Sequence, residues 1–194
     1  MKTIDYYNQY ADEFAQATLN VDMESLYQPF LAELPERARI LDVGCGSGRD
    51  TLAFLNKGYQ VDAIDYSEAL VKRATLLTSI AVQQQSFYDI DVQDVYDGVW
   101  ACASLLHSDR NRLPEVLKRI HAALRRGGVC YMSFKYDTTD REKDGRVFTN
   151  LDEDQAKELL DQLDGVAVLK QWITVDKRPD RKEEWLNVLW KKHA

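Results

Sequence analysis

The stretch Arg39–Asp50 constrains the fold more than any other part of the chain. A short apolar run with one embedded acid, Asp42, is followed by three glycines at every second position, Gly44, Gly46 and Gly48. This pattern predicts a buried strand, a tight turn and the start of a helix. Glycine can adopt positive φ and lets backbone approach a ligand closely, and the first N–H groups of a helix have no partner within it. We therefore predict that a small ligand binds against this turn.

Strands and helices alternate along the chain. The predicted strands are 39–43, 60–65, 81–85, 98–103, 129–134, 166–175 and 184–190. The first thirty-odd residues are predicted to be helical, with an aromatic stripe of Tyr6, Tyr7, Tyr10 and Phe14 on the first helix and a second helix at 23–34. The other predicted helices are 49–56, 67–78, 112–125 and 152–163. This alternation predicts an α/β fold, Rossmann-like, with a seven-stranded, mostly parallel sheet and helices on both faces. Residues 177–183 are too few for a helical crossover, so the last strand should run antiparallel. The charged segment 137–150 is predicted to be an irregular, solvated loop.

Composition limits the possible partners. The chain has 194 residues, 45% of them hydrophobic, which is enough for one domain with a full core. The formal net charge of −7 disfavours nucleic acid as a partner and favours a small molecule. No run of 18 apolar residues occurs, so no membrane partner is expected. Cys45, Cys102 and Cys130 lack the spacing of a disulfide framework or a metal site, and we predict a cytoplasmic location and no bound metal.

The glycine turn fits an adenosine-containing ligand better than a dinucleotide. Arg49 occupies the position where a dinucleotide-binding turn requires its last glycine. Asp65 ends the second predicted strand, and an acid there can accept hydrogen bonds from both ribose hydroxyls. Asp42, beside the turn, would repel a pyrophosphate but would suit an ammonium group. The plainer alternatives are an edge-strand acid for Asp42 and a helix cap for Asp65, although Ser67 already fills the capping position.

Four segments together carry a family resemblance. They are residues 41–48 (LDVGCGSG), 62–67 (DAIDYS), 96–100 (YDGVW) and 124–128 (LRRGG). In this combination the chain resembles the class I S-adenosylmethionine-dependent methyltransferases. Residues 44–49 with 57–61 most resemble a small bacterial branch labelled tellurite-resistance or thiopurine type. The resemblance implies one domain over 1–194, with a helical lid at 1–35, a cofactor-binding core at 36–135, and a substrate-side segment with the last two strands at 136–194.

The resemblance also implies a set of residues that bind S-adenosylmethionine. Those implied for the methionine part are Gly44, Gly46, Gly48, Ala103 and Ser104, with Asp42 near the amino group and Cys45 contributing its backbone. Those implied for the nucleoside are Asp65 on the ribose, Tyr66 against the adenine, and Ser86 with Phe87 at the adenine dipeptide. The family places an acid at that dipeptide, so Asp89 is the alternative to Ser86.

The implied reaction is methyl transfer to a small-molecule acceptor. His107 and Tyr7 are the candidate catalytic residues, although His107 could be structural, the aromatic stripe could be core, and a thiol acceptor would need no base. Lys135 either faces an anionic substrate or pairs with Asp137 or Asp140. Two other functions stay open: a non-catalytic S-adenosylmethionine-binding module, and a nicotinamide-dependent oxidoreductase, which the glycine register disfavours. The oligomeric state is open.

Overall fold

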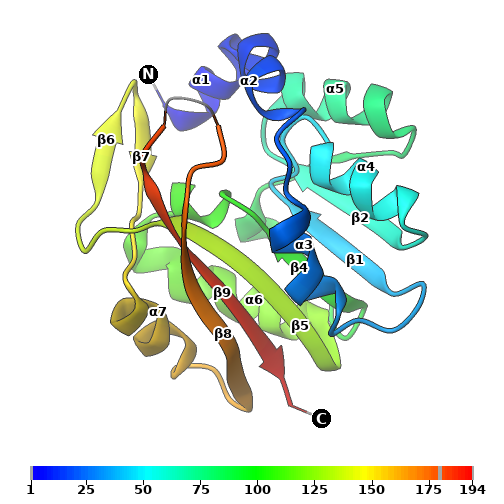
Figure 1. The fold of residues 1–194 in the computed structure, drawn as a ribbon, viewed down its shortest axis with the longest axis vertical. Coiled ribbons are helices and arrows are strands. Elements are labelled where there is room, and N and C mark those ends of the chain that lie inside the picture. The colour runs from blue at the N-terminus through cyan, green and yellow to red at the C-terminus, as the bar shows by residue number, and fades with distance from the viewer. Residues whose placement is uncertain (1, 179–180, 194) are drawn as a thin grey trace.

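The computed structural model describes residues 2–178 and 181–193, and its centre is a seven-stranded sheet (Figure 1). The strand order is β3-β2-β1-β4-β5-β9-β8. The strands are β1 (Arg39–Val43), β2 (Gln60–Asp65), β3 (Gln83–Gln84), β4 (Tyr96–Ala101), β5 (Leu124–Lys135), β8 (Val166–Val175) and β9 (Glu184–Lys192). All neighbours from β3 to β5 pair in parallel, whereas β9 pairs antiparallel with both β5 and β8. The predicted fold class, including the antiparallel last strand, is confirmed.

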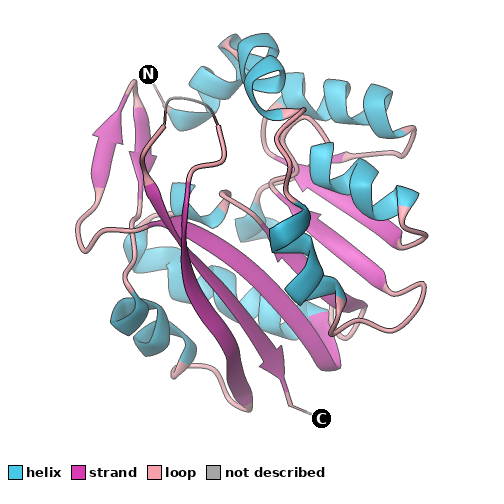
Figure 2. Ribbon diagram, viewed as in Figure 1, coloured by secondary structure: helices cyan, strands magenta, loops and turns pink. Residues whose placement is uncertain are grey.

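Helices cover both faces of the sheet (Figure 2). The α-helices are α1 (Thr3–Gln9), α2 (Ala11–Thr18), α3 (Glu24–Leu31), α4 (Arg49–Asn56), α5 (Glu68–Thr78), α6 (Leu113–Ala123) and α7 (Glu153–Leu160). Three short 3-10 helices are η1 (Phe87–Asp89), η2 (Leu105–His107) and η3 (Arg110–Arg112). Successive strand residues point to opposite faces: Val99 packs with α6 and α7, whereas Trp100 packs with α3 and α4. No helix in the described part of the chain is long and apolar enough to span a membrane.

The largest departure from the predicted elements is in the segment 137–150. Instead of an irregular loop, it contains a hairpin of β6 (Arg141–Lys143) and β7 (Arg146–Phe148). The turn residues Asp144 and Gly145 both have positive φ, 54° and 74°. An Asp-Gly pair with this geometry makes the two-residue turn that matches strand twist, which is why the charged segment folds back on itself.

Other boundaries also differ. The predicted aromatic helix breaks at Tyr10, which has φ −112° and ψ 30° and ends α1 as it begins α2. The break lets α2 bury Ala11 and Ala15, whereas α1 buries no residue. Strand β4 begins at Tyr96, before the predicted start, and β5 begins at Leu124 because α6 ends at Ala123. The weak strand predicted at 81–85 is only Gln83–Gln84.

Candidate functional site

The turn between β1 and α4 is fixed by hydrogen bonds to β2. The backbone N–H groups of Gly44 and Cys45 both donate to the Ile64 carbonyl, at 2.9 and 3.0 Å. Gly44 and Gly46 have positive φ, and a Cβ on Gly44 would lie 2.4 Å from Ser104 Cβ. Only glycine therefore fits here, because both the backbone conformation and the space exclude a side chain.

Two cavities open at the carboxyl ends of the parallel strands and share one wall. We call them the Asp65 cavity, of about 350 Å³, and the Arg146 cavity, of about 180 Å³. The first is lined by the ends of β1 and β2 and by η1; the second by the start of α4, the end of β5, the β6–β7 hairpin and the β8–β9 connection. The residues that line both are Tyr7, Phe14, Gly44, Gly46, Ala103 and His107. Open α/β sheets bind ligands at this edge.

The Asp65 carboxylate is held by backbone donors alone. Its Oδ2 accepts from the Gly46 N–H at 2.9 Å and its Oδ1 from the Ser67 N–H at 2.8 Å. Burial raises the pKa of Asp65 to about 6, so the group is still ionised at neutral pH. No lysine or arginine is among the described residues that line this cavity. Each carboxylate oxygen retains a free lone pair, so the group can accept further hydrogen bonds from a ligand.

Most of the other predicted cofactor residues also line the Asp65 cavity. Tyr66, Ser86, Phe87, Ala103 and Ser104 all do so. The hydroxyl of Ser104 is buried and has no hydrogen-bond partner within the described residues, which is unusual unless a ligand supplies one.

The two predicted catalytic residues are in contact. The Tyr7 hydroxyl lies 2.8 Å from His107 Nε2, and His107 Nδ1 lies 2.9 Å from the Val147 carbonyl oxygen. A carbonyl only accepts, so Nδ1 carries the hydrogen and Nε2 accepts from Tyr7. Burial lowers the pKa of His107 to about 4, which keeps the imidazole neutral at physiological pH. His107 is thus a neutral base at the wall between the two cavities.

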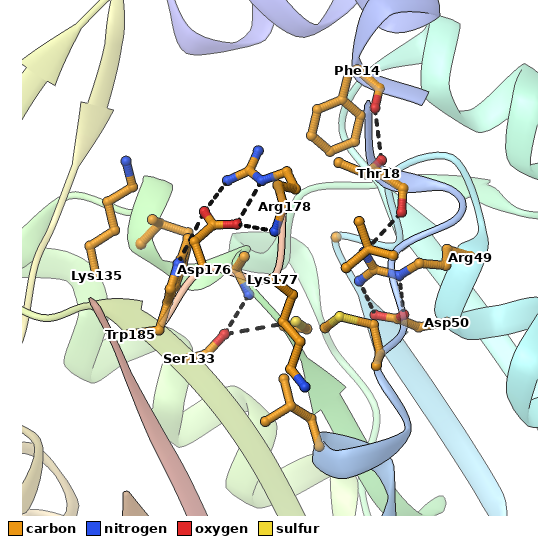
Figure 3. A pocket seen from close by; sticks show the side chains of 18 of the residues that line it. Phe14, Thr18, Arg49, Asp50, Ser133, Lys135, Asp176, Lys177, Arg178 and Trp185 are labelled. Carbon is orange, nitrogen blue, oxygen red and sulfur yellow. Dashed lines mark hydrogen bonds and ion pairs between the residues drawn. The ribbon is translucent and has the colours of Figure 1, made fainter. Parts of the chain in front are cut away.

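The Arg146 cavity is rich in basic side chains. Seven line it, Arg49, Lys135, Lys143, Arg146, Lys177, Arg178 and Arg181, against two acids, Asp50 and Asp176. Figure 3 shows Asp176 binding Arg178 and Trp185 on one wall, while Asp50 binds Arg49 on the opposite wall. The walls therefore hold more positive than negative charge.

Part of the chain is similar to a known family. Residues 40–128 match the sequence profile of a family described as a methyltransferase domain. An uncharacterized methyltransferase from Staphylococcus carnosus is 24% identical over 98% of this chain and 100% of its own length. The solved 1,6-didemethyltoxoflavin-N1-methyltransferase from Burkholderia thailandensis is similar with a TM-score of 0.79 at 24% identity, covering 98% of this chain and 85% of that one. The N-methyltransferase NodS from Bradyrhizobium japonicum has a TM-score of 0.78 at 14% identity, covering 99% of both chains.

Residues 40–128 are thus similar to a methyltransferase domain. This match fits the predicted enzyme class, the S-adenosylmethionine-dependent methyltransferases, and the two solved structures confirm the predicted fold. The chain spans 36%, 47% and 45% of the length of three other curated relatives that it matches.

Three residues predicted to bind the cofactor are absent from the described lining of both cavities. Asp42 is buried behind the turn and accepts from the Thr51 hydroxyl at 2.6 Å; burial and the nearby Asp50 charge raise its pKa to about 8. Gly48 begins α4 and packs against α5, where a Cβ would lie 3.1 Å from Ala74 Cα. Asp89, the alternative to Ser86, is also absent from the described lining of both cavities.

Cys45 differs from its prediction in another way. It lines the Arg146 cavity, but its backbone N–H is already bonded to the Ile64 carbonyl. The backbone donor expected for the cofactor is therefore used to hold the turn.

The sequence analysis missed Asp50. Its carboxylate accepts from the Tyr27 hydroxyl at 2.5 Å and from Trp100 Nε1 at 2.8 Å, and pairs with Arg49 at 2.6 Å. Arg49 and these hydrogen bonds hold the pKa of Asp50 below its ordinary value despite burial. In the sequence Asp50 looks like an acid that complements the start of a helix, and only the buried aromatic partners reveal its role.

The predicted partners of Lys135 were also wrong. Lys135 pairs with Glu183 at 3.0 Å, and Glu183 accepts from Arg141 as well. Asp140 instead pairs with Arg110 at 2.6 Å. These links connect the β6–β7 hairpin to the β8–β9 connection around the Arg146 cavity. No three His, Cys, Asp or Glu side chains among the described residues are grouped to hold a metal ion.

Proposed function

We propose that this protein transfers a methyl group from S-adenosylmethionine to a small-molecule acceptor. The observation that carries the proposal is the pair of cavities with one shared wall, at the edge of the sheet where the methyltransferase glycine turn lies. When bound, S-adenosylmethionine supplies a methyl group on a sulfonium that is already a good leaving group. The protein then has to position the reactants and exclude water, and positioning alone contributes about 7–11 kcal/mol in favourable cases.

The residues of the Asp65 cavity fit this cofactor. Asp65 is oriented by two N–H donors and is ionised at neutral pH, as an acceptor for two ribose hydroxyls should be. Tyr66 and Phe87 are aromatic side chains that would lie against the adenine. The unpartnered Ser104 hydroxyl and the backbone of Gly44 would face the methionine part. Asp42 supports the turn from behind through Thr51.

His107 is the proposed general base. The Tyr7 hydroxyl takes a proton from the acceptor as it passes its own proton to the Nε2 lone pair, and Nδ1 stays bonded to the Val147 carbonyl. Both side chains line both cavities, which supports this role, because the methyl group must pass from the cofactor in one cavity to the acceptor in the other.

A small acceptor is supported by the size of the Arg146 cavity, about 180 Å³. The similar Burkholderia enzyme is described with bound 1,6-didemethyltoxoflavin, a small molecule. The narrower tellurite-resistance or thiopurine branch and the cytoplasmic location stay predictions, as do the lid at 1–35 and the substrate-side segment at 136–194. The methyltransferase family match gives no support to the nicotinamide alternative.

The test begins with titration calorimetry of the purified chain with S-adenosylhomocysteine and with NAD. We expect binding of the first compound and none of the second; the reverse would overturn the proposal. A panel of phenols, thiols, amines and oxyanions with methyl-labelled S-adenosylmethionine then separates an enzyme from a binding module, since only an enzyme labels an acceptor.

The role of His107 is tested with the acceptor that the panel finds. His107→Gln should lower turnover by about 100-fold, the usual scale of general-base catalysis, with unchanged affinity for S-adenosylhomocysteine. His193→Gln, outside both cavities, is the matched control. Turnover at the control's level would make His107 structural.

A further inference from the structure

Charge separates the Arg146 cavity from the rest of the molecule. The chain as a whole has a formal net charge of −7, whereas this cavity is lined by seven basic side chains and two acidic ones. Both acids are already used: Asp50 by Arg49, and Asp176 by Arg178 at 2.5 Å. Lys135 is held by Glu183. The positive charge that remains for a ligand comes from the β6–β7 hairpin and from the β8–β9 connection.

Among these basic residues, Arg146 is largely buried and has hydrogen-bond donors that are not paired within the described part of the chain. Its side chain is 17% exposed, and its Nε is buried without a hydrogen-bond partner among the described residues. Within the described residues it pairs with Asp144 alone, at 3.3 Å, and Asp144 is 57% exposed, so the pair is weakened by solvent. The guanidinium plane lies over the Tyr6 ring, with its carbon 4.0 Å from the ring centre. A guanidinium held this way presents uncommitted donors in a fixed orientation, which is how arginine binds planar anions.

Arg146 also lies close to the proposed base. Its guanidinium carbon is 6.0 Å from the centre of the Tyr7 ring, and the next residue, Val147, binds His107 through its carbonyl. A ligand whose anionic group binds Arg146 could therefore place a second group beside the Tyr7–His107 pair, with only a few covalent bonds between the two groups of the ligand. Lys143, at the other end of the same turn, lines the cavity and adds a second positive charge.

Apolar side chains also line the cavity. Leu106, Phe148 and Trp185 contribute to its lining, and Met23 and Leu26 lie at the α3 side. A molecule that fills it needs an apolar body as well as an anionic group.

Resting on the proposed function, we propose that the acceptor is a small carboxylate or phosphate ester with an apolar body, whose anionic group binds Arg146 and Lys143. The nucleophilic atom of such a molecule lies a few bonds from the anion, beside Tyr7 and His107. Neutral and cationic analogues of the same shape bind less well, because they leave the arginine donors unpaired.

The binding test uses probes of one shape and different charge. Benzoate, phenyl phosphate and benzamide are titrated against protein saturated with S-adenosylhomocysteine, with dissociation constants from ligand-observed NMR. At least one of the two anions should bind ten times more tightly than benzamide, and the advantage should shrink in high salt; the better anion identifies the carboxylate or phosphate class. Equal affinity of benzamide and both anions would overturn the proposal.

Variants assign the effect to the hairpin. Arg146→Met should reduce the affinity for the preferred anion at least tenfold and Lys143→Met about threefold, while benzamide is unaffected. Arg125→Met, which removes an arginine far from both cavities, is the matched control. Since Arg146 also packs on Tyr6, the exposed Lys143 provides a variant that does not depend on this packing. Unchanged anion affinity in both variants would overturn the assignment.

The two proposals fail in different ways. If wild-type protein does not bind S-adenosylhomocysteine, the proposed function is wrong. If it binds S-adenosylhomocysteine but does not prefer an anion, the proposed function stands and only the acceptor class is wrong.

Discussion

The two cavities differ in charge although they share six lining residues. The Asp65 cavity contains one carboxylate and, among its described residues, no lysine or arginine, whereas the Arg146 cavity contains seven basic side chains. The proposed cofactor, S-adenosylmethionine, is positively charged at its sulfonium and suits the first cavity. An anionic acceptor suits the second. Opposite charges on the two sides of one wall can therefore direct each reactant to its own place and bring them together at Tyr7 and His107.

The buried acids of the two cavities differ in a parallel way. Asp50 is neutralised by Arg49 and bonded to Tyr27 and Trp100, so all its capacity is used inside the protein. Asp65 is oriented by two backbone N–H groups and has no cationic partner. The first arrangement stabilises the fold, and the second leaves a carboxylate ready for a ligand.

The largest expected effect is on folding. Asp50→Ala leaves Arg49 without its partner in a buried position, which should lower the free energy of unfolding by about 3–5 kcal/mol. Denaturant unfolding measures this change. Asp62→Ala, which removes a half-exposed acid paired with Arg39, is the control and should have a much smaller effect. If the two variants were equally stable, the contacts of Asp50 would not stabilise the fold as proposed.

The next effect is the pH dependence of stability at the shared wall. His107 has a pKa of about 4 in the folded protein against an ordinary value of 6.5. Between these values the unfolded chain binds a proton that the folded chain does not, so the stability from neutral His107 is lost as the pH falls. The stability advantage of wild type over His107→Gln should decrease by up to about 3 kcal/mol between pH 7 and pH 4. A constant difference across denaturation curves at these pH values would contradict the neutral, enclosed imidazole.

Asp65→Ala should affect the ligand and spare the fold. Loss of charged hydrogen bonds to the ribose should weaken S-adenosylhomocysteine binding by about 1.5–3 kcal/mol, more than tenfold in calorimetry. Asp62→Ala on the same strand is again the control. Wild-type affinity should also fall below pH 6, where Asp65 becomes protonated. Unchanged affinity in Asp65→Ala would show that the ribose does not bind Asp65.

The smallest effect is expected at the mouth of the Asp65 cavity. Tyr66 is 58% exposed, so Tyr66→Ala should not disturb the fold. Loss of its contact with the adenine should weaken S-adenosylhomocysteine binding by about 1 kcal/mol, roughly fivefold. Tyr136→Ala removes an exposed tyrosine outside both cavities and should leave affinity unchanged. Equal affinities of the two variants would show that Tyr66 does not contact the adenine.

Local sequence chemistry predicted the Asp65 cavity better than the Arg146 cavity. The glycine turn and Asp65 follow from neighbouring residues and strand alternation, and parallel pairing then brings the ends of β1 and β2 together. The Arg146 cavity is built by segments from distant parts of the chain, such as Lys135 and Glu183, and no local pattern indicates which charges meet.

Two of the misses had different causes. The hairpin could have been found, because Asp144-Gly145 is a known turn signal, but the alternating charges around it suggested a solvated loop. The helix break at Tyr10 could not have been predicted, because no glycine or proline lies at that position.

Helix α1 contributes Tyr7 to both cavities, and this position has a consequence for the order of events in the proposed catalytic cycle. It buries no side chain fully, and its polar contacts include Thr3 with Val147 and Asn8 with Ser67. Moving this helix would break the Tyr7–His107 hydrogen bond and the stacking of Arg146 on Tyr6, but it would expose no fully buried side chain. Because Tyr7 on α1 lines both cavities, one swing about Tyr10 would admit or release both reactants together. The rate at which this single gate opens would then set an upper limit on how fast product can leave.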